Sequence, residues 1–409
     1  AIKRTLFKDL KEASEISTLG FQAKHKVIAF SNAIIDRSGR VFNANESNGI
    51  VEYGDNILFI PAASSLFESD NRYFNERKFA YRPGSADFAT WAKLQYQAYG
   101  YNGTFSLLFD VAAIFSDIVF LHSPGFVPYL FKFGPPNTAK SSHTELSLSL
   151  WGQGLKPISL EGASTEKGFS RKNAQLCNAL VVYEEYTNTI SDKMIGVLKT
   201  GYNRLGYERG NKTMDNSTTS SQVLSAIVII GNELPTAKSA LFGRVVLLEY
   251  SKGTTHDPFS DNEKEAFENL MKLADEGLGN IVVEIFKHRE FIEANYPKEY
   301  RRTSRILKSL LEQKSISVDQ RTLGNNACIL AVYELLNNKL DFHIEREKLY
   351  MTTVENIKKQ KDSQSRASET ALFWNSFSNG IREKKLIEET DFKVSRLEKN
   401  EIYIQYGRA

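Results

Sequence analysis

The chain has 409 residues, of which 41% are hydrophobic and 25% are charged, and its formal net charge is +3. This composition is typical of a globular protein of two or three domains, and it excludes a disordered or fibrous chain. The nearly neutral charge neither demands nor excludes nucleic acid, so any basic surface must be local. The chain has only two cysteines, and its six histidines are scattered without metal-ligand spacing. We therefore expect neither a disulfide framework nor a structural zinc, and we expect a reducing, cytoplasmic location.

The beginning of the chain carries no targeting signal. It starts at Ala1 without a methionine and without the apolar core of a signal peptide, so we expect an internal fragment or a processed chain. The most apolar stretch, residues 105–121, is interrupted by Asp110 and Asp117. This pattern favours a buried helix over a membrane span, and we expect no membrane partner.

The first hundred residues predict a small N-terminal α+β module. β-rich runs at 27–30, 49–53 and 57–61 are separated by turns rich in Asn and Gly. Residues 87–99 follow with helical periodicity, because apolar side chains recur on one face. We assign residues 1–100 to this module.

Residues 134–142 carry the most informative pattern in the chain. They follow the phosphate-loop pattern G-x-x-x-x-G-K-[ST], with Ala139 where the second glycine is expected. A strand-like run at 129–133 precedes them and a helix-like segment at 141–151 follows, which is the context the motif requires. Backbone N–H groups in such a loop form an anion site, in which Lys140 would reach the β and γ phosphates and Ser141 would bind Mg²⁺. The alternative is an ordinary turn that contains a lysine. The nucleotide-binding residues predicted here are Gly134, Pro135, Pro136, Asn137, Thr138, Ala139, Lys140, Ser141 and Ser142.

Paired acids follow another buried strand. The region 101–290 alternates helical segments with short apolar runs at 129–133, 157–160, 179–183, 226–231 and 245–249, which predicts a mostly parallel sheet. Glu184 and Glu185 emerge at the carboxyl end of one run, where ligands bind in open α/β sheets. Glu184 would order the Mg²⁺ shell and Glu185 would polarise the attacking water. Solvated glutamates at a strand end are the alternative.

Two further polar residues complete an ordered set. Asn232 follows the apolar run 226–231 and is placed to hydrogen-bond the γ-phosphate or the lytic water, although an Asx turn would use the same residue. Arg244 precedes the next strand and would neutralise transition-state charge across a subunit boundary, because its planar fork binds phosphate bidentately. A surface arginine beside a glycine is the alternative. Lysine loop, acids, asparagine and arginine in this order predict a nucleotide hydrolase.

The loop, with Asn137 before the lysine, resembles motif A of the superfamily-3 helicases, a branch of the AAA+ ATPases found in viruses, plasmids and mobile elements. The run ending in Glu184 and Glu185 resembles motif B of that family, and the run ending in Asn232 resembles motif C. The resemblance covers about residues 100–255. It implies an AAA+ P-loop core with ATP and Mg²⁺ as cofactors. It also implies a homo-oligomeric ring, a hexamer, with Arg244 acting in trans and with a primase or initiator module as partner.

The resemblance also suggests where DNA would bind. In these helicases a hairpin before the sensor strand carries a basic residue into the central pore. Here the corresponding segment, 201–212, offers Lys212 and Arg209 for the DNA backbone, with Tyr207 for stacking. An exposed Gly/Asn-rich loop is the alternative.

The remaining residues predict a helical C-terminal region. Residues 263–296 indicate helices that end at Pro297, and 366–386 is amphipathic. Two strand candidates, 392–394 and 402–404, follow, and this order resembles a winged-helix module, although a helix with a hairpin is common elsewhere. We assign 101–260 to the ATPase core, 261–315 to a helical lid or connector, and 316–409 to a C-terminal domain.

Taken together, these patterns predict an ATP-dependent, replicative DNA helicase of the phage or mobile-element type that translocates on single-stranded DNA. The first alternative is an AAA+ assembly or signalling switch without helicase activity, which Ala139 favours slightly. The second is a DNA-binding module with a degenerate loop, which the intact paired acids disfavour.

Overall fold

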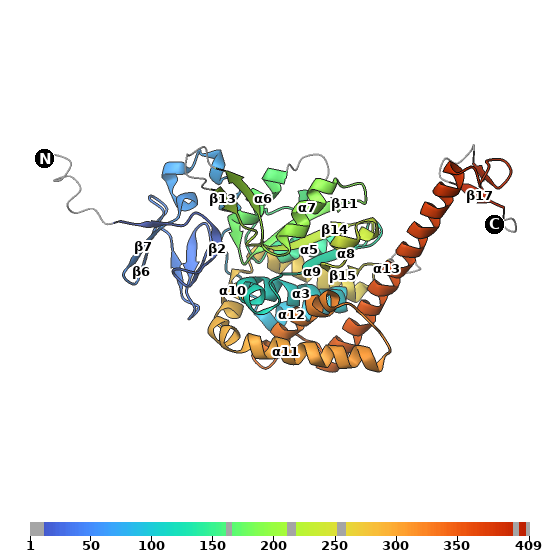
Figure 1. Cartoon of the computed structure of the whole chain (residues 1–409). Helices are drawn as coiled ribbons and strands as arrows, with labels where there is room; N and C mark the ends of the chain where they lie inside the picture. Colours follow the sequence, from blue (N-terminus) through green and yellow to red (C-terminus); the bar gives the residue numbers. More distant parts are fainter. Residues whose placement is uncertain (1–11, 161–165, 211–217, 252–258, 396–400, 406–409) are drawn as a thin grey trace. The chain divides into compact units, whose positions relative to one another are not determined.

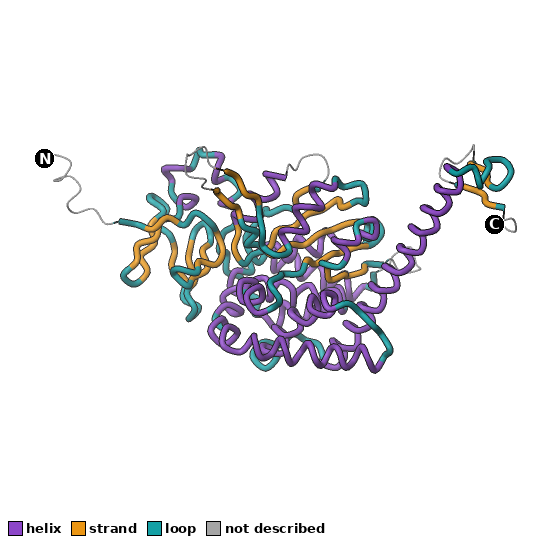
Figure 2. Tube along the Cα trace, in the orientation of Figure 1, coloured by secondary structure: helices purple, strands orange, loops and turns teal. Residues whose placement is uncertain are grey.

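The structure is a computed structural model that describes residues 12–160, 166–210, 218–251, 259–395 and 401–405. Its contacts divide the chain into a first unit, residues 1–357, and a second unit, residues 358–409. Figure 1 follows the chain through both units, and Figure 2 separates its helices from its strands. The N-terminal module and the central sheet both belong to the first unit.

The N-terminal module is built from two small sheets. The first is an antiparallel meander of β2 (Leu19–Gln22), β3 (Val27–Ala29), β4 (Ala33–Ile35) and β5 (Val41–Asn43), and the second contains β1 (Ser14–Glu15), β7 (Asn56–Phe59) and β6 (Ile50–Tyr53). The short 3₁₀ turns η1 (Pro61–Ala63), η2 (Ser65–Phe67), η3 (Asn71–Tyr73) and η4 (Glu76–Lys78) follow. A distant strand, β10 (Leu176–Cys177), pairs in parallel with β2. The module therefore completes its sheet with a strand from the central region.

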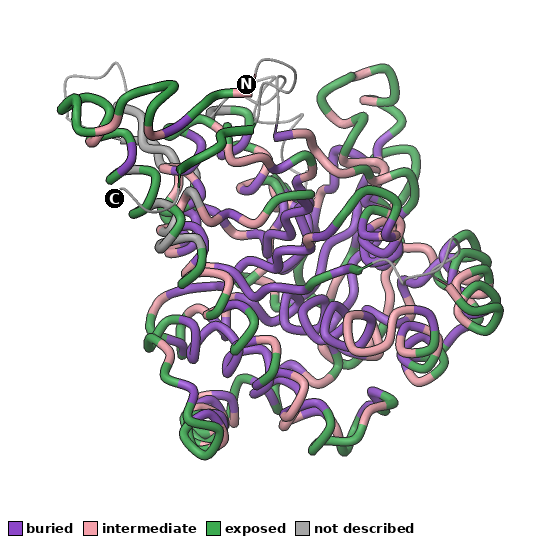
Figure 3. The backbone as a smooth tube through the Cα atoms, turned by 90° about the vertical axis from the view of Figure 1, so that its right-hand side faces the viewer, coloured by how far each residue is buried: buried purple, intermediate pink, exposed green. Residues whose placement is uncertain are grey.

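The central sheet has five parallel strands in the order β15-β8-β14-β11-β9. Their bounds are Val245–Glu249 (β15), Tyr129–Phe133 (β8), Ala226–Gly231 (β14), Leu180–Tyr186 (β11) and Ile158–Ser159 (β9). All five lie within the apolar runs predicted from the sequence or extend them by a few residues. Most strand residues are buried, except in the half-buried edge strand β9 and at exposed Glu185 and Glu249, as expected for a sheet that is covered on both faces. Figure 3 shows the buried interior of the chain. This arrangement confirms the predicted α/β fold with a P-loop ATPase core.

Alternation along β8 shows which helices cover each face. Tyr129 points to one face, where its hydroxyl donates to the Leu198 carbonyl of α7 (Asp192–Gly201) at 2.7 Å. Lys132 lies three residues further along the strand, so it points to the opposite face. There burial raises the pKa of Asp110 in α3 (Tyr101–Ile114), and the positive charge of Lys132 lowers it. The sheet therefore lies between a layer containing α7 and a layer containing α3, as Figure 1 shows. The remaining helices of this region are α2 (Phe88–Tyr99), α4 (Ser116–His122), α5 (Lys140–Leu148), α6 (Glu166–Gln175) and α8 (Ser239–Phe242).

The apolar stretch 105–121 forms parts of α3 and α4. From Gly103 to its end, α3 is completely buried within the first unit, as expected for a core helix. Among the described residues, no single helix has the length and apolar character needed to cross a membrane. The pair α3 and α4 reaches that threshold only when the two are counted together across an 82° bend.

A helical layer follows the sheet in the sequence. It contains α9 (Asp261–Glu276), α10 (Gly279–Phe286), α11 (Arg289–Gln313) and α12 (Gln320–Leu336). The predicted stop at Pro297 is wrong, because α11 runs through this proline. A proline removes one backbone hydrogen bond, but buried side chains at Tyr296, Tyr300 and Leu307 continue on one face of α11. Tertiary packing therefore offsets the local cost, and Tyr296 also donates to the Cys328 carbonyl of α12 at 3.0 Å.

The second unit begins within α13 (Arg346–Arg382) and ends with the antiparallel pair β16 (Phe392–Val394) and β17 (Ile402–Ile404). Both strands coincide with the predicted ones. Phe377 of α13 packs edge-on against Phe392 of β16, with ring centroids 5.1 Å apart. The helical C-terminal region is thus confirmed, while its winged-helix assignment stays a prediction.

Candidate nucleotide-binding site

The loop between β8 and α5 has a backbone that only particular residues tolerate. Gly134 has a φ of +152°, and a Cβ at this position would lie 1.9 Å from the Tyr250 carbonyl oxygen. A side chain at Gly134 would therefore clash with backbone that cannot easily move. Asn137 adopts φ 60° and Ala139 adopts φ 62°, both in the left-handed region. Gly134, Asn137 and Ala139 thus give the loop three positive φ angles before α5 begins.

Ala139 explains why the motif normally has glycine at this position. It is the N-cap of α5, with φ 62° and ψ 16°, and its carbonyl accepts the His143 amide hydrogen at 2.9 Å. A non-glycine residue in this region costs about 1–2 kcal/mol relative to the right-handed region. The alanine therefore adopts the conformation that the glycine would supply, at a modest energetic cost.

Lys140 lies buried at the start of α5, with 6% of its surface exposed. Its ammonium donates to the carbonyl oxygens of Gly134 and Pro135, each at 2.6 Å, and to the Thr138 hydroxyl at 3.1 Å. The hydroxyl of Thr138 in turn donates to the Pro135 carbonyl at 2.8 Å. Because the loop's own oxygens hold this charge, it is pre-positioned at the floor of the loop.

The paired acids lie on an irregular part of β11. The register with β14 shifts between Tyr183 and Tyr186, and Glu185 within this bulge has a φ of 61°. The exposed Glu185 carboxylate accepts a hydrogen bond from the Ser159 hydroxyl of β9. Glu184 is half-buried, and burial, followed by the charges of Glu185 and Glu145, raises the pKa of its carboxyl. A strained non-glycine backbone that aims a carboxylate at a cavity is typical of functional sites.

A single pocket brings the three predicted motifs together. It has a volume of about 370 Å³, and we call it the loop pocket. Because β8, β14 and β11 are adjacent and parallel, the polar groups that follow them meet at one edge of the sheet. Its lining is Pro136, Asn137, Thr138, Ala139, Lys140, Ser141, Ser142, Glu184, Glu185, Ile230, Gly231 and Asn232. Gly134 and Pro135 are outside this lining and contribute the carbonyls that hold Lys140.

Arg244 is the predicted site residue that the structure places elsewhere. It precedes β15, and its carbonyl accepts the Tyr129 amide at the start of β8, so it lies at the amino edge of the sheet. Its guanidinium lies 5.4 Å from the centroid of the Tyr202 ring and donates to the Ala240 carbonyl. It therefore cannot complete the loop pocket of its own subunit, and its role in trans stays a prediction.

The predicted DNA-contacting segment forms a hairpin at the expected position. β12 (Tyr207–Gly210) pairs antiparallel with β13 (Thr218–Ser221), directly before β14. Tyr207 and Arg209 lie on β12, of which only the backbone is described. Lys212 lies outside the described residues. The hairpin is therefore present, and its side-chain roles stay predictions.

Sequence reasoning missed one polar residue of the site. Ser159 lies at the end of the edge strand β9 and donates to Glu185, although it was treated only as part of a strand. Its position at the carboxyl end of a neighbouring parallel strand is the signal that would have indicated it. Gly231 is the other omission, and a Cβ there would lie 3.1 Å from the Tyr186 Cβ, so a larger residue would crowd the bulge.

A buried polar layer lies behind the loop. His143 of α5 stacks on Tyr99 with ring centroids 4.0 Å apart, and its Nδ1 shares a 2.6 Å hydrogen bond with the Tyr250 hydroxyl. Burial lowers the pKa of His143 well below its usual value, so this imidazole is neutral. Because Tyr250 is also the residue beside Gly134, this layer fixes the position of the loop's first turn.

The donor set of the loop pocket fits ATP and Mg²⁺. The amides at the start of α5 and the Lys140 ammonium suit phosphate oxygens. The Ser141 hydroxyl and the Glu184 carboxylate are hard oxygen ligands, and Mg²⁺ characteristically takes only one or two protein ligands together with phosphates. The volume of the pocket is also within the usual range for small-molecule sites.

Comparisons with known proteins identify similar structures but no similar sequence. No protein-family model and no curated protein matches the chain. Among solved structures, the active helicase Cch of SCCmec type IV is similar with a TM-score of 0.59 at 14% identity, over 95% of this chain and 68% of that chain. The apo C-terminal region of NrS-1 has a TM-score of 0.28 at 12% identity, over 83% of this chain and 90% of that chain. The JCV helicase has a TM-score of 0.27 at 13% identity, over 68% and 67% of the two chains.

Only the first of these similarities is close enough to carry an argument. It extends over nearly the whole chain, so it includes the N-terminal module, the central sheet and the helical region together. The low sequence identity limits the inference to architecture. The chain therefore has the fold of a helicase P-loop ATPase core, with an N-terminal α+β module and a helical C-terminal region.

Proposed function

We propose that this chain is the core of an ATP-dependent DNA helicase of the replicative, mobile-element or phage type. The observation that carries the proposal is the meeting of motif A, the paired acids and Asn232 around the loop pocket, at the ends of three adjacent parallel strands. The superfamily-3 assignment rests on the resemblance of these motifs, with Asn137 as its most specific mark. The similarity in architecture to the Cch helicase supports the same function.

Lys140, Ser141, Glu184, Glu185 and Asn232 have separate roles in binding or hydrolysis. Incoming phosphates replace the carbonyl and hydroxyl oxygens that hold Lys140, while the loop amides bind the phosphate chain. Ser141 and Glu184 would hold Mg²⁺, which would supply positive charge to offset that of the phosphates. Glu185 accepts a proton from the attacking water, and Asn232 orients that water or the γ-phosphate. Ser159 positions Glu185 by donating a hydrogen bond to its carboxylate.

The position of Arg244 is the reason for proposing a ring. It lies at the amino edge of the sheet, whereas the loop pocket lies at the carboxyl edge. An arginine there reaches phosphate only in the pocket of a neighbouring copy. A homo-oligomeric ring, which we propose to be a hexamer, would place one Arg244 in each shared site. A primase or initiator module would act with this ring as a partner.

The strand β14 offers a physical link between hydrolysis and DNA. The hairpin of β12 and β13 precedes this strand, and Asn232 follows it. A shift of Asn232 when the γ-phosphate leaves would be transmitted along a fully buried strand to the base of the hairpin. With Arg209 and Lys212 gripping phosphates and Tyr207 stacking on a base, the hairpin would pull a single strand with little sequence preference.

The test compares DNA-stimulated ATPase and strand unwinding of the wild type with those of Lys140→Ala, both with Mg²⁺. We expect activity in the wild type and its loss in the variant, because alanine removes the charge that binds the phosphates. Equal activity in both proteins would disprove the proposal. So would the absence of activity in the wild type at high protein concentration.

The second candidate function is an AAA+ assembly or signalling switch that binds ATP without translocating. The left-handed Ala139 favours it, because strain at the N-cap of α5 would slow a working motor. Nucleotide-dependent ring formation without any stimulation by DNA would support the switch over the helicase.

A further inference from the structure

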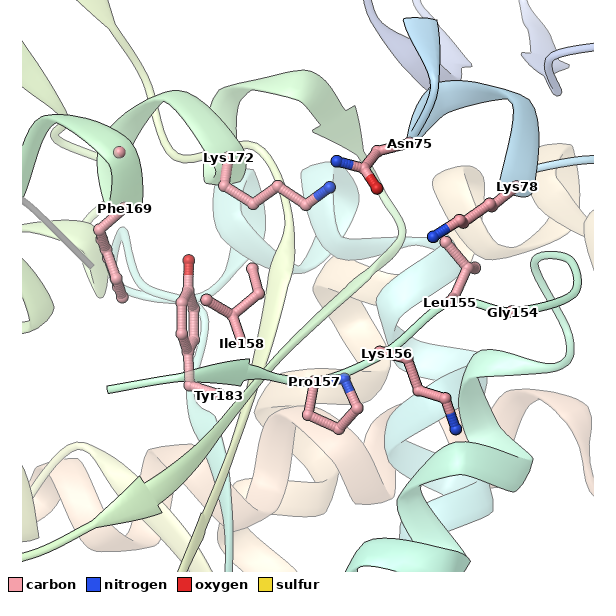
Figure 4. A pocket seen from close by; sticks show the side chains of 11 residues that line it. Asn75, Lys78, Gly154, Leu155, Lys156, Pro157, Ile158, Phe169, Lys172 and Tyr183 are labelled. Carbon is pink, nitrogen blue, oxygen red and sulfur yellow. The ribbon is translucent and has the colours of Figure 1, made fainter. Parts of the chain in front are cut away.

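A second pocket lies between the N-terminal module and the edge of the central sheet. It has a volume of about 410 Å³, and we call it the lysine pocket. Three segments form it together with Tyr183 of β11: residues 75–78 around η4, residues 154–158 leading into β9, and residues 168–172 of α6. None of the residues with a proposed role in ATP hydrolysis lines it. Figure 4 shows the side chains that face it.

The lysine pocket carries an excess of positive charge. Lys78 and Lys172 extend into it from opposite walls, with Asn75 beside them (Figure 4). Burial lowers the pKa of Lys172, the charge of Glu76 raises it, and the charge of Lys78 lowers it further. Glu76 therefore offsets part of this positive charge, and no carboxylate is among the described residues that line the pocket. The lysine pocket therefore favours an anion.

Lys156 contributes less to this charge. It lines the pocket, but in Figure 4 its ammonium points away from Lys78 and Lys172. A salt bridge of 2.9 Å joins it to Glu145 of α5. Its charge is thus already paired with a carboxylate of the ATPase core.

The other walls of the lysine pocket are apolar and aromatic. Leu155, Pro157 and Ile158 are half-buried there, whereas Phe169 and Tyr183 are fully buried and stack on each other with ring centroids 4.4 Å apart. Phe74, which is 58% exposed, lies close to the pocket, because the Lys78 ammonium is 4.5 Å from the centroid of its ring. A large exposed aromatic side chain beside a lysine is the usual means of stacking an unpaired base next to a phosphate.

We propose that the lysine pocket is a second nucleic-acid-binding site, which takes one nucleotide of a single DNA strand. Lys78, Lys172 and Asn75 bind its phosphate, the half-buried wall of Leu155, Pro157 and Ile158 receives its base, and Phe74 stacks on the adjacent base. A phosphodiester carries one negative charge, which the two lysines can neutralise, whereas a free triphosphate carries about four and would be under-neutralised. A duplex would keep its bases stacked inside, so the apolar wall favours an unpaired strand.

This site extends the proposed function, because it gives the strand a contact outside the hairpin of β12 and β13. It is formed jointly by the N-terminal module and the ATPase core. A strand that binds there therefore bridges these two parts of the first unit.

The test measures binding of a 5′-labelled oligo-dT by fluorescence anisotropy, without nucleotide, over a series of salt concentrations. The double variant Lys78→Gln/Lys172→Gln is compared with a matched double variant, Lys93→Gln/Lys287→Gln, which removes the same charge from two exposed lysines elsewhere. We expect about tenfold weaker binding in the pocket variant and a salt slope smaller by about 0.7, the value for one phosphate contact on a single strand. The control should bind like the wild type.

A second variant, Phe74→Ala, changes no charge. We expect it to weaken oligo-dT binding about fivefold or more through lost stacking, with an unchanged salt slope. Basal ATPase activity without DNA and the thermal melting curve report whether these variants remain folded. An oligonucleotide carrying 5-iodouracil should crosslink on irradiation to the peptide that contains Phe74, and this crosslink should be lost in the lysine variant.

Three outcomes would overturn the proposal. One is oligo-dT affinity and salt slope in the pocket variant equal to those of the control. Another is a wild-type crosslink map without the peptide that contains Phe74. The third is binding of thymidine 5′-monophosphate that depends on Lys78 and Lys172 while oligo-dT binding does not, since this would assign the pocket to a free nucleotide. If the wild type still unwinds DNA in these cases, only the pocket assignment fails. If it hydrolyses ATP but binds no oligo-dT, the helicase proposal fails as well.

Discussion

The loop pocket and the lysine pocket have similar volumes, about 370 and 410 Å³, but the chain builds them differently. Seven of the twelve residues that line the loop pocket come from the continuous segment 136–142, and strand ends supply the remainder. The lysine pocket combines three distant segments with Tyr183, and none of these segments has a recognisable motif. The comparison shows that a site is readable in the sequence when one turn supplies most of its ligands.

The lysines of the two pockets also differ in how their charges are held. Lys140 is bound by three oxygens of its own loop before any ligand arrives. Lys78 and Lys172 instead repel each other across a cavity, with Glu76 as partial compensation. The loop oxygens thus fix the Lys140 charge in place, whereas in the lysine pocket a bound anion would reduce the repulsion between Lys78 and Lys172.

The largest expected effect is that of Glu185→Gln in the loop pocket. The amide keeps the shape but cannot take a proton from water, so we expect ATPase activity to fall by about 10²–10³. Binding of a fluorescent ATP analogue should persist. Lys78→Gln in the lysine pocket should leave basal ATPase activity near the wild-type value, and a comparable fall there would remove the distinction between the pockets.

The next largest effect is a difference in stability between substitutions at two glycines, Gly134 and Gly154. Gly134→Ala would place a Cβ 1.9 Å from the Tyr250 carbonyl, so we expect loss of nucleotide binding and a drop of several kcal/mol in the free energy of unfolding. Gly154 of the lysine pocket also has a positive φ, +71°, but a Cβ there has no neighbour within 4 Å. Gly154→Ala should therefore cost only about 1 kcal/mol. Chemical denaturation of both variants would contradict this account if the two losses were equal.

Ala139→Gly is expected to have a smaller effect, which leaves turnover unchanged or raises it. Glycine adopts φ 62° without the steric cost of a Cβ, but it also increases the entropy of the unfolded chain, so the two effects largely cancel. We expect turnover equal to the wild type or a few-fold higher, measured by steady-state ATPase assays. A clear decrease would show that alanine is required at this position.

The smallest effect concerns Lys156, which lines the lysine pocket but acts on the loop pocket. Its charge lowers the pKa of Glu184, while burial, Glu185 and Glu145 raise it. In the proposed function Glu184 would hold Mg²⁺ only as a carboxylate, so activity should fall as the pH drops through this pKa. Lys156→Gln should move the acidic limb of the pH–rate profile to higher pH, and Glu145→Gln should move it lower, each by less than about one unit. Shifts in the same direction for both variants would refute this electrostatic link.

Much of the ATPase core could be predicted because its signals are local. Strands such as 129–133, 226–231 and 245–249 are short apolar runs, and the structure reproduces their bounds. Asn232 and the paired acids were placed at a common edge because parallel strands end together. Ser159 was missed because its partner, Glu185, belongs to a neighbouring strand that is distant in sequence.

Non-local packing accounts for the remaining differences. Pro297 ends a helix by its local chemistry, yet α11 continues because apolar side chains on both sides of it are buried on one face. The pairing of β10 with β2 joins segments more than 150 residues apart and could not be read from either. Arg244 was placed correctly before its strand, but only the sheet shows that it lies at the edge opposite the loop pocket.

The sequence by itself determined the phosphate loop, the order of its partner motifs and the parallel sheet, since each depends on residues adjacent in the chain or on strand periodicity. The tertiary structure alone decided the strained backbone of Gly134, Ala139 and Glu185, and it alone assembled the lysine pocket. The physical reason is that backbone strain and converging charges are sustained by packing between segments distant in sequence, such as Gly134 against Tyr250 and Lys78 opposite Lys172.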